Sequence, residues 1–131
     1  MNLKFVNTIV FVKDISVSKA FYAETLGLKI IEDYGAFILF ENHLALHQAR
    51  ELAVTVWKAD APSDTDQPQG QQNLLIYFET DVLEDAFIRL KDQVKLIHPI
   101  QRQAWGQSVF RFYDPDGHVV EIGEPMKGSL A

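Results

Sequence analysis

The 131-residue chain is 47% hydrophobic, carries a net charge of −6 and contains no cysteine. Its length fits one domain with a core large enough to fold without disulfide bonds or a structural metal. The missing cysteines exclude disulfides and thiolate metal sites, which favours a reducing cytoplasm. No basic cluster offers a surface to nucleic acid or an anionic membrane, and no apolar stretch approaches the ~20 residues of a membrane span. We therefore expect a cytoplasmic protein, without a signal peptide, that acts on a small molecule.

The first half of the chain predicts the order strand, helix, strand, strand, strand. Strands rich in β-branched and aromatic side chains are predicted at residues 5–12, 28–34, 36–41 and 43–49. Between the first two strands, Asp14 or Ser16 can cap a helix with an apolar face, and Gly27 is expected to end it. A turn at Gly35 separates the second strand from the third.

The segment 50–72 is predicted as a linker. Its second part is polar and contains Pro62, Pro68 and Gly70, a composition typical of loops. The stretch before it, "ELAVTVW" at 51–57, fits either a strand or a short helical turn.

The second half repeats the order of the first. Strands are predicted at residues 73–80, 94–100, 108–114 and 118–123. Apolar residues at helical spacing predict a helix at 81–93, and Pro99 is expected to end the strand that follows this helix.

One alignment between the halves can be checked residue by residue. Residues 38–47 lie over 112–121 without a gap, so that His47 falls on Glu121. Repeated units usually pair because one alone cannot bury its hydrophobic face. The repeat therefore predicts an α+β protein with two sheets, each backed by a helix, around a concave interior.

Two stretches of the chain carry a family resemblance. "VKDISVSKAFYAETLGLKI" (12–30) and "WGQSVFRFYDPDGHVVEI" (105–122) resemble the signature stretches of the vicinal oxygen chelate superfamily. That superfamily includes glyoxalase I, fosfomycin-resistance proteins, extradiol dioxygenases and bleomycin-resistance proteins. The resemblance extends over about residues 5 to 124.

This resemblance implies the glyoxalase/bleomycin-resistance/dioxygenase fold, in which two βαβββ units form a curved mixed sheet around a cavity. The chain would then be one domain over 1–131, with a first unit at 1–49, the linker at 50–72 and a second unit at 73–124. Because short chains of the family commonly dimerise, we expect a homodimer with a small-molecule ligand.

The resemblance also implies positions for metal ligands, on the first and last strand of each unit. The last-strand positions fall on His47 and Glu121, which are competent ligands. The first-strand positions fall on Asn7, a weak ligand, and on Leu75 (or Leu74), which cannot bind a metal. A catalytic site usually needs about three protein ligands, so the metal site is predicted to be degenerate. One divalent cation (Mn²⁺, Ni²⁺, Zn²⁺ or Fe²⁺) on His47 and Glu121 is left open.

Glu121 is the residue on which most of the functional interpretation depends. Side chains alternate along a strand, which places Glu121 on the face opposite Val120 and Ile122. An interior carboxylate needs a partner or a raised pKa, and such a group could also serve as a catalytic base. Arg111 would share its sheet face rather than that of Phe110 and Phe112, and could meet an anionic ligand group or lie at the surface.

Aromatic side chains supply the predicted ligand-binding surface, since small-molecule sites are usually apolar with a few polar groups. The predicted ligand-binding residues are Asn7, Phe37, Trp57, Tyr77, Trp105, Phe110 and Phe112, although about half of the aromatic ones are expected to be ordinary core. The turn "DPDG" at 114–117 is given a structural role, because its residues favour a tight turn.

Three functions follow from these predictions. The favoured one is metal-free binding of a small, partly aromatic molecule. The alternative is a metal-dependent lyase, isomerase or dioxygenase that uses His47 and Glu121, with the glyoxalase I reaction itself not expected. The third is an interaction module that has kept the scaffold and lost the ligand site.

Overall fold

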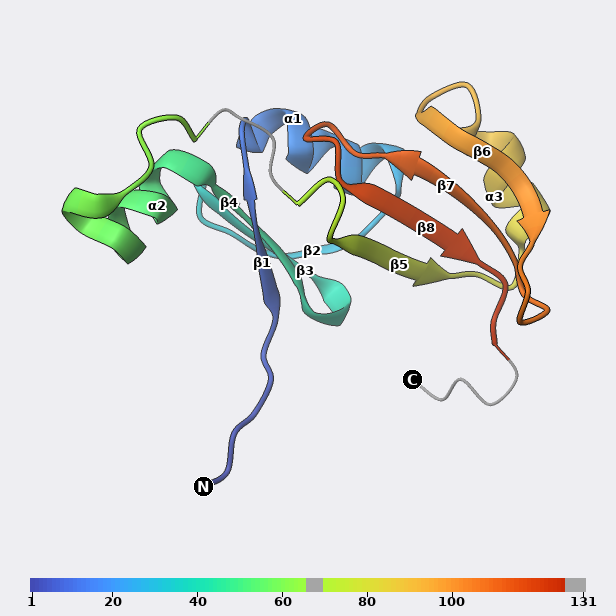
Figure 1. Ribbon diagram of the computed structural model, residues 1–131, viewed down its shortest axis with the longest axis horizontal. Coiled ribbons are helices and arrows are strands. Elements are labelled where there is room, and N and C mark those ends of the chain that lie inside the picture. The colour runs from blue at the N-terminus through green and yellow to red at the C-terminus, as the bar shows by residue number, and fades with distance from the viewer. Residues whose placement is uncertain (66–69, 127–131) are drawn as a thin grey trace. The chain divides into compact units, whose positions relative to one another are not determined.

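The computed structural model describes residues 1–65 and 70–126, which form two compact units (Figure 1). Unit 1 is Met1–Pro68 and unit 2 is Gln69–Ala131. The strands and α-helices of unit 1 are β1 (Thr8–Val12), α1 (Ile15–Ala20), β2 (Ile30–Asp33), β3 (Phe37–Phe40), β4 (Leu44–Gln48) and α2 (Ala49–Trp57). Those of unit 2 are β5 (Leu75–Glu79), α3 (Leu83–Leu90), β6 (Lys95–Arg102), β7 (Ser108–Tyr113) and β8 (Val119–Gly123).

The two units have the same topology. The strand order is β1-β4-β3-β2 in unit 1 and β5-β8-β7-β6 in unit 2. In each sheet the first and last strands of the unit pair in parallel, and the remaining pairs are antiparallel. The predicted α+β fold of two βαβββ units is confirmed, as two open four-stranded mixed sheets.

The first helical segment begins and ends as its sequence predicts. The side chain of Asp14 accepts hydrogen bonds from the backbone N–H groups of Ser16 (3.0 Å) and Val17 (3.3 Å), which satisfies two donors that a helix start leaves without partners. A π-helical turn at Phe21–Thr25 continues the helix. Gly27 follows at φ +76°, a backbone conformation that side chains with a Cβ disfavour.

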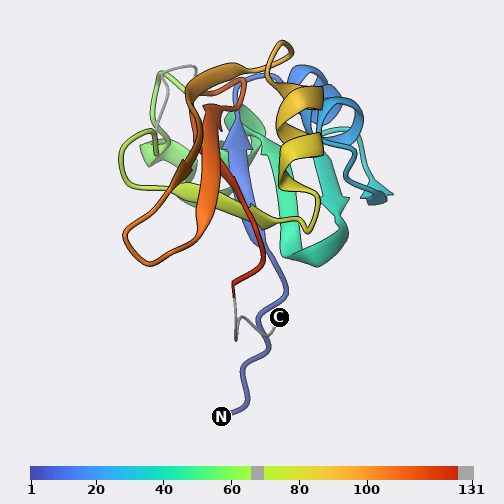
Figure 2. The ribbon, with the colours of Figure 1, turned by 90° about the vertical axis from the view of Figure 1, so that its right-hand side faces the viewer.

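Each sheet packs one face against its helix. In unit 1 the fully buried Tyr22, from the π-helical turn, contacts Phe40 with ring centroids 6.1 Å apart. In unit 2 Phe87 of α3 meets the fully buried Phe110 edge-on, at 5.2 Å between centroids. Figures 1 and 2 both show α3 along one face of the unit 2 sheet. The other face of each sheet carries the residues considered below.

The stretch 51–57, which the sequence leaves open between a strand and a short helical turn, is helical. The segment predicted as a linker begins with α2, which packs against β1 and β4, because Ala49 and Ala53 are buried and Trp57 contacts Phe11 at 5.8 Å between ring centroids. Unit 1 therefore extends beyond residue 49, and the remainder of the predicted linker includes 66–69, which lie outside the described residues.

Pro99 does not end its strand, and the prediction that it would was wrong. It lies inside β6, the edge strand of the unit 2 sheet. An edge strand tolerates a residue without an N–H group, because one side of the strand has no partner to which that group would donate. The pairing of β6 with β7 shifts register on either side of this position, between Leu96 and His98 and between His98 and Gln101.

In the part of the chain that the structure describes, no helix has both the length and the apolar character needed to cross a bilayer.

Candidate functional site

A row of polar and aromatic side chains crosses the whole sheet of unit 2. Glu121 on β8 pairs with Tyr77 on β5 and with Arg111 on β7, and Arg111 pairs with His98 on β6. Directly paired residues project from the same face of a sheet. Phe110 and Phe112, which alternate with Arg111, project from the other face toward α3. The row therefore lies on the face that α3 leaves uncovered.

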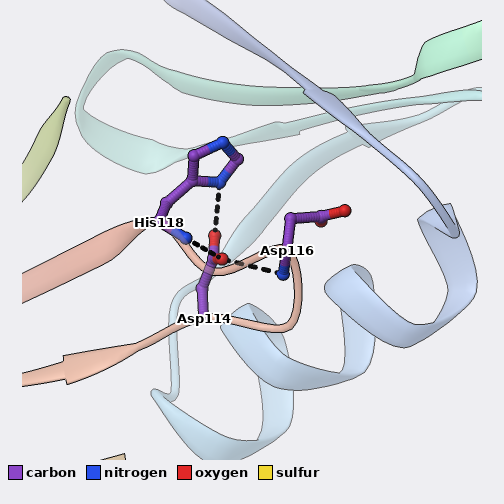
Figure 3. Close-up of side chains that lie close together, drawn as sticks. All are labelled: Asp114, Asp116 and His118. Atoms are coloured by element: carbon purple, nitrogen blue, oxygen red, sulfur yellow. Dashed lines mark hydrogen bonds and ion pairs between the residues drawn. The ribbon is translucent and has the colours of Figure 1, made fainter. Parts of the chain in front are cut away.

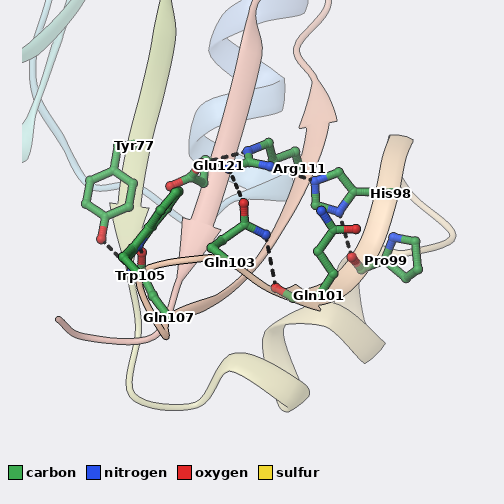
Figure 4. Close-up of polar contacts among 9 residues, drawn as sticks. All are labelled: Tyr77, His98, Pro99, Gln101, Gln103, Trp105, Gln107, Arg111 and Glu121. Carbon is green, nitrogen blue, oxygen red and sulfur yellow. Dashed lines mark hydrogen bonds and ion pairs between the residues drawn. The ribbon is translucent and has the colours of Figure 1, made fainter.

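Arg111 is the centre of this row (Figure 4). Its Nε donates to Oε1 of Glu121 at 2.7 Å, its Nη1 to Nε2 of His98 at 3.0 Å, and its Nη2 to Oε1 of Gln103 at 3.1 Å. The side chain of Glu121 is 8% exposed and that of Arg111 is 20% exposed. The buried carboxylate thus has the partner that its position requires, and the partner is a cation supplied by the chain.

The partners of His98 define the form of its imidazole. Its Nδ1 lies 2.7 Å from the carbonyl oxygen of Pro99, which can only accept, and its Nε2 lies 3.0 Å from a guanidinium nitrogen, which can only donate. These two contacts match an imidazole that donates from Nδ1 and accepts at Nε2. His98 acts as an acceptor that helps to hold Arg111 in position.

Beside this row, the amide of Gln107 holds two aromatic side chains. Its Nε2 donates to the hydroxyl of Tyr77 at 2.7 Å, and its Oε1 accepts from Nε1 of Trp105 at 2.9 Å (Figure 4). Nε2 also donates to the carbonyl of Glu124 at 2.7 Å. Gln107 is 5% exposed, whereas Tyr77 is 42% and Trp105 57% exposed. A buried amide therefore presents two exposed rings in a fixed arrangement.

Tyr77 keeps its proton to higher pH than an ordinary tyrosine. Burial raises the pKa of its hydroxyl, and the hydrogen bond that it donates to the carboxylate of Glu79 raises it further, against the opposing effect of the hydrogen bond from Gln107. The neutral hydroxyl thus stays available as both donor and acceptor, which the contacts with Glu79 and Gln107 require.

The corresponding face of unit 1 carries a row of rings. His47 on β4 pairs with Phe11 on β1 and with Phe37 on β3. Phe11 contacts Trp57 at 5.8 Å between centroids, and Phe37 contacts His47 at 6.0 Å and Tyr34 at 6.3 Å. His47 and Glu121 thus occupy corresponding positions, each between the first and third strands of its unit, as the alignment of the halves predicts.

The predicted metal ligands do not meet within one unit. Asn7 and His47 belong to unit 1, while Leu75 and Glu121 belong to unit 2. Nδ1 of His47 lies 3.0 Å from the backbone carbonyl of Gln48, so the ring nitrogen that remains for other contacts is Nε2. Shared use of one ion by His47 and Glu121 stays a prediction.

The predicted ligand-binding residues fall into three groups. Phe37, Trp57 and Asn7 are in unit 1, where Phe37 and Trp57 join the row of rings. Tyr77 and Trp105 lie together beside Glu121 in unit 2. Phe110 and Phe112 are fully buried on the helix-covered face, with their rings 5.7 Å apart, so they belong to the core there and cannot contact a ligand on the Glu121 face.

Sequence interpretation missed three residues of the site. These are His98, Gln103 and Gln107, none of which carries a sequence signal that marks it as part of the site. Alternation along β7 does place Arg111 beside Glu121, but the pairing of β6 with β7 that brings in His98 has irregular register. Gln103 and Gln107 close the turn between these strands, with the N–H of Gln103 donating to the carbonyl of Gln107 at 2.7 Å.

The turn between β7 and β8 contains a separate polar cluster (Figure 3). Ligand atoms of Asp114, Asp116 and His118 lie within 4.8 Å of one another, close enough to hold a metal ion. Oδ1 of Asp114 accepts from the N–H groups of Asp116 and His118, both at 2.9 Å, and Oδ2 lies 3.0 Å from Nδ1 of His118. These contacts are those of a turn held by an aspartate side chain, in keeping with its predicted structural role.

Comparison with protein families agrees with this geometry. A family described as a glyoxalase-like domain matches residues 5–127. The chain belongs to the glyoxalase-like family. Its structural neighbours lie in the glyoxalase/bleomycin resistance/dioxygenase superfamily, the group that the two signature stretches resemble. A comparison with curated proteins finds no match.

Solved structures resemble the chain over nearly its whole length. A protein of unknown function from Agrobacterium tumefaciens is 50% identical, with a TM-score of 0.89, and the match covers 96% of this chain and 97% of that one. A glyoxalase/bleomycin resistance protein/dioxygenase from Nocardioides is 20% identical, with a TM-score of 0.75 over 98% and 87% of the two chains. The fosfomycin resistance protein FosX from Listeria monocytogenes is 17% identical, with a TM-score of 0.71 over 98% of each chain. At these lower identities the likeness is one of fold.

Proposed function

We propose that the protein binds a small, partly aromatic molecule without a metal ion, on the Glu121 face of unit 2. The observation that carries the proposal is the ion pair between Arg111 and Glu121. In metal-dependent members of the superfamily the position of Glu121 is that of a metal ligand. In this chain Nε of Arg111 lies 2.7 Å from Oε1 of Glu121, so a guanidinium already neutralises the carboxylate.

The residues at Glu121 do not fit a metal centre. A divalent ion on this carboxylate would sit close to the positive guanidinium of Arg111. Two like unit charges 4 Å apart repel by about 4 kcal/mol at an effective dielectric constant of about 20, and the repulsion doubles for a divalent ion. Leu75, at the position that would supply a second ligand in this unit, has no donor atom. The alternative, a metal-dependent lyase, isomerase or dioxygenase using His47 and Glu121, loses support for the same reason, and so does a catalytic base at Glu121 that acts on a metal-bound substrate.

The aromatic side chains support binding. Tyr77 and Trp105 expose about half of their surface, yet both are anchored through Gln107. Rigid aromatic side chains supply contact area at a low cost in conformational entropy. The same face carries a charged pair, so it joins apolar contact area with a few polar groups, as small-molecule sites usually do.

A homodimer in the cytoplasm remains part of the proposal. Dimerisation is common in the superfamily, and the chain carries no cysteine that would call for an oxidising compartment. Sedimentation equilibrium tests the first point, with twice the chain mass expected and the mass of one chain contradicting it.

Fluorescence of the tryptophan in unit 2 tests the proposed binding. The chain has two tryptophans, one in each unit, so Trp57→Phe leaves Trp105 as the reporter. This protein, stripped with chelator, is titrated with quinolin-2-one and with 2-naphthol. We expect saturable quenching that is the same with and without chelator and that is lost in Tyr77→Ala.

Tyr34→Ala is the matched control, because Tyr34 in unit 1 also donates its hydroxyl to a glutamate two residues away, Glu32, and is also exposed. This variant should keep the quenching. Quenching that disappears with chelator and returns with a divalent metal would contradict the proposal, as would the absence of quenching by any aromatic compound.

A further inference from the structure

We infer that the ligand at the Glu121 face is an uncharged aromatic molecule with a hydrogen-bond donor and an acceptor side by side, as in an aromatic amide or lactam. This inference rests on the proposed function and names the ligand class for its site. It follows from which hydrogen-bonding groups on the face are already used and which are still available.

Most polar atoms around the site already have partners. Nε1 of Trp105 is bonded to Gln107. The hydroxyl of Tyr77 accepts from Gln107 and donates to Glu79. Both ring nitrogens of His98 are engaged. These side chains can therefore offer a ligand apolar surface and ring faces, but no further strong hydrogen bond without losing one.

Arg111 and Glu121 still have hydrogen-bonding groups that a ligand could use. A guanidinium has five N–H groups, and three nitrogens of Arg111 each make one hydrogen bond to a described residue. Two N–H groups, one on each terminal nitrogen, make none within the described part of the chain. The contact of Glu121 with Arg111 uses Oε1, while Oε2 accepts no hydrogen bond from any described residue. The pair thus offers a donor next to an acceptor.

Charge then selects among ligands that could use this pair. A carboxylate ligand would be attracted by Arg111 and repelled by Glu121. An ammonium ligand would be attracted by Glu121 and repelled by Arg111. Because the pair is neutral as a whole, neither ion gains a net attraction, yet both would lose hydration on binding. An amide or lactam gives its C=O to the guanidinium and its N–H to the carboxylate without bringing a charge.

The spacing across the sheet suits such a molecule. Tyr77, Glu121 and Arg111 are directly paired on three adjacent strands, and side chains at paired positions are separated by roughly 5 Å. An amide group above Glu121 and Arg111 would therefore place an attached ring system toward Tyr77 and Trp105.

Three probes that share one ring system test the inference by calorimetry: 2-naphthamide, 2-naphthoate and 2-naphthylmethylammonium. We expect wild-type protein to bind the amide at least about tenfold more tightly than either ion, since each ion leaves one charge of the site badly matched. Glu121→Gln keeps an acceptor for Arg111 but removes the negative charge, so the preference should move toward 2-naphthoate. Arg111→Gln should move it toward the ammonium probe.

The outcomes separate this inference from the proposed function. If wild-type protein prefers 2-naphthoate or the ammonium probe, the inference is wrong while aromatic binding stands. If no probe binds and the tryptophan of unit 2 responds to no aromatic compound, the proposed function fails and the inference fails with it. If a variant does not fold, the affinities of wild-type protein for the three probes decide the question by themselves. If both variants fold and keep the wild-type preference among the probes, the inference is also wrong.

Discussion

Replacing Arg111 with methionine removes the cation from the buried carboxylate of Glu121. The side chain of Glu121 is 8% exposed, so the remaining charge cannot be well hydrated. Breaking a buried ion pair from one side typically costs 3–5 kcal/mol, and because Arg111 is itself one-fifth exposed we expect the lower end, about 3 kcal/mol.

The double replacement Arg111→Met with Glu121→Met should recover most of this loss. Exchanging a buried ion pair for apolar side chains of similar volume is often neutral, because it removes both desolvation costs together. Glu121→Met alone leaves the more exposed guanidinium unpaired, with its bonds to His98 and Gln103 intact. We expect this variant to lose less, about 1 kcal/mol.

Urea unfolding in a Trp57→Phe background measures these differences, since the fluorescence then comes from unit 2. The expected order of stability is parent, double variant, Glu121→Met and, well below them, Arg111→Met. A loss under about 0.5 kcal/mol in Arg111→Met, the range of ordinary surface substitutions, would refute the account of the ion pair. So would a double variant that is as unstable as Arg111→Met.

Three further predictions concern residues around the site. A Cβ at Gly123 would lie 2.5 Å from Nε2 of Gln107. Gly123→Ala should therefore displace that amide, red-shift the fluorescence of the unit 2 tryptophan and lower the free energy of unfolding by about 1–3 kcal/mol. An unshifted spectrum would contradict this. Because the pKa of Tyr77 is raised, its stabilising contribution is present below pH ~10 and is lost as the pH rises through the higher folded-state value. Ultraviolet titration should therefore show a late tyrosine that is absent in Tyr77→Phe, while the late titration of Tyr34, whose pKa is raised by its hydrogen bond to Glu32, remains in this variant. Four tyrosines titrating alike would oppose this. Asp114→Ala should lower the stability in thermal unfolding by about 3 kcal/mol, because it loses one hydrogen bond to Asp116 and two to His118. Asp114→Asn keeps an oxygen that accepts from the backbone N–H groups, so it should lose about half as much. Equal losses in the two variants would count against the structural role of the turn.

The repeated fold could be predicted from the sequence because each element carries its own local signal. Asp14 and Gly27 mark the ends of the first helical segment, and alternation along β8 places Glu121 opposite Val120 and Ile122. The gapless alignment of the halves predicts the correspondence of His47 with Glu121 from the sequence alone. The first two signals depend only on neighbouring residues and the third on a comparison of two stretches of sequence, so none of them requires tertiary information.

The network around Glu121 depends instead on contacts between strands. Alternation along β7 predicts the correct sheet face for Arg111 but not its partners. Its pairing with Glu121 depends on the turn between β7 and β8, and its contact with His98 depends on the register shifts near Pro99. Gln107 gives no local signal at all. Its side chain can hold Tyr77 and Trp105 because the turn between β6 and β7 positions it and because Gly123 has no Cβ to occupy the space of the amide. The sequence of α2 was ambiguous because its valines and Trp57 favour a strand as well as a helix. The helix is decided by tertiary packing, in which Trp57 contacts Phe11.

Metal affinity at Glu121 is the most direct test of the central claim that Arg111 stands in the place of a metal ion. Chelator-stripped protein is titrated with Mn²⁺, Ni²⁺, Zn²⁺ and Fe²⁺ by calorimetry, beside Glu121→Ala, His47→Ala and Asp116→Ala. The account predicts that the Glu121 and His47 replacements remove no binding, and that any ion held at the turn cluster is lost in Asp116→Ala alone. Tight binding of about one ion per chain that disappears in both Glu121→Ala and His47→Ala, and persists in Asp116→Ala, would contradict it.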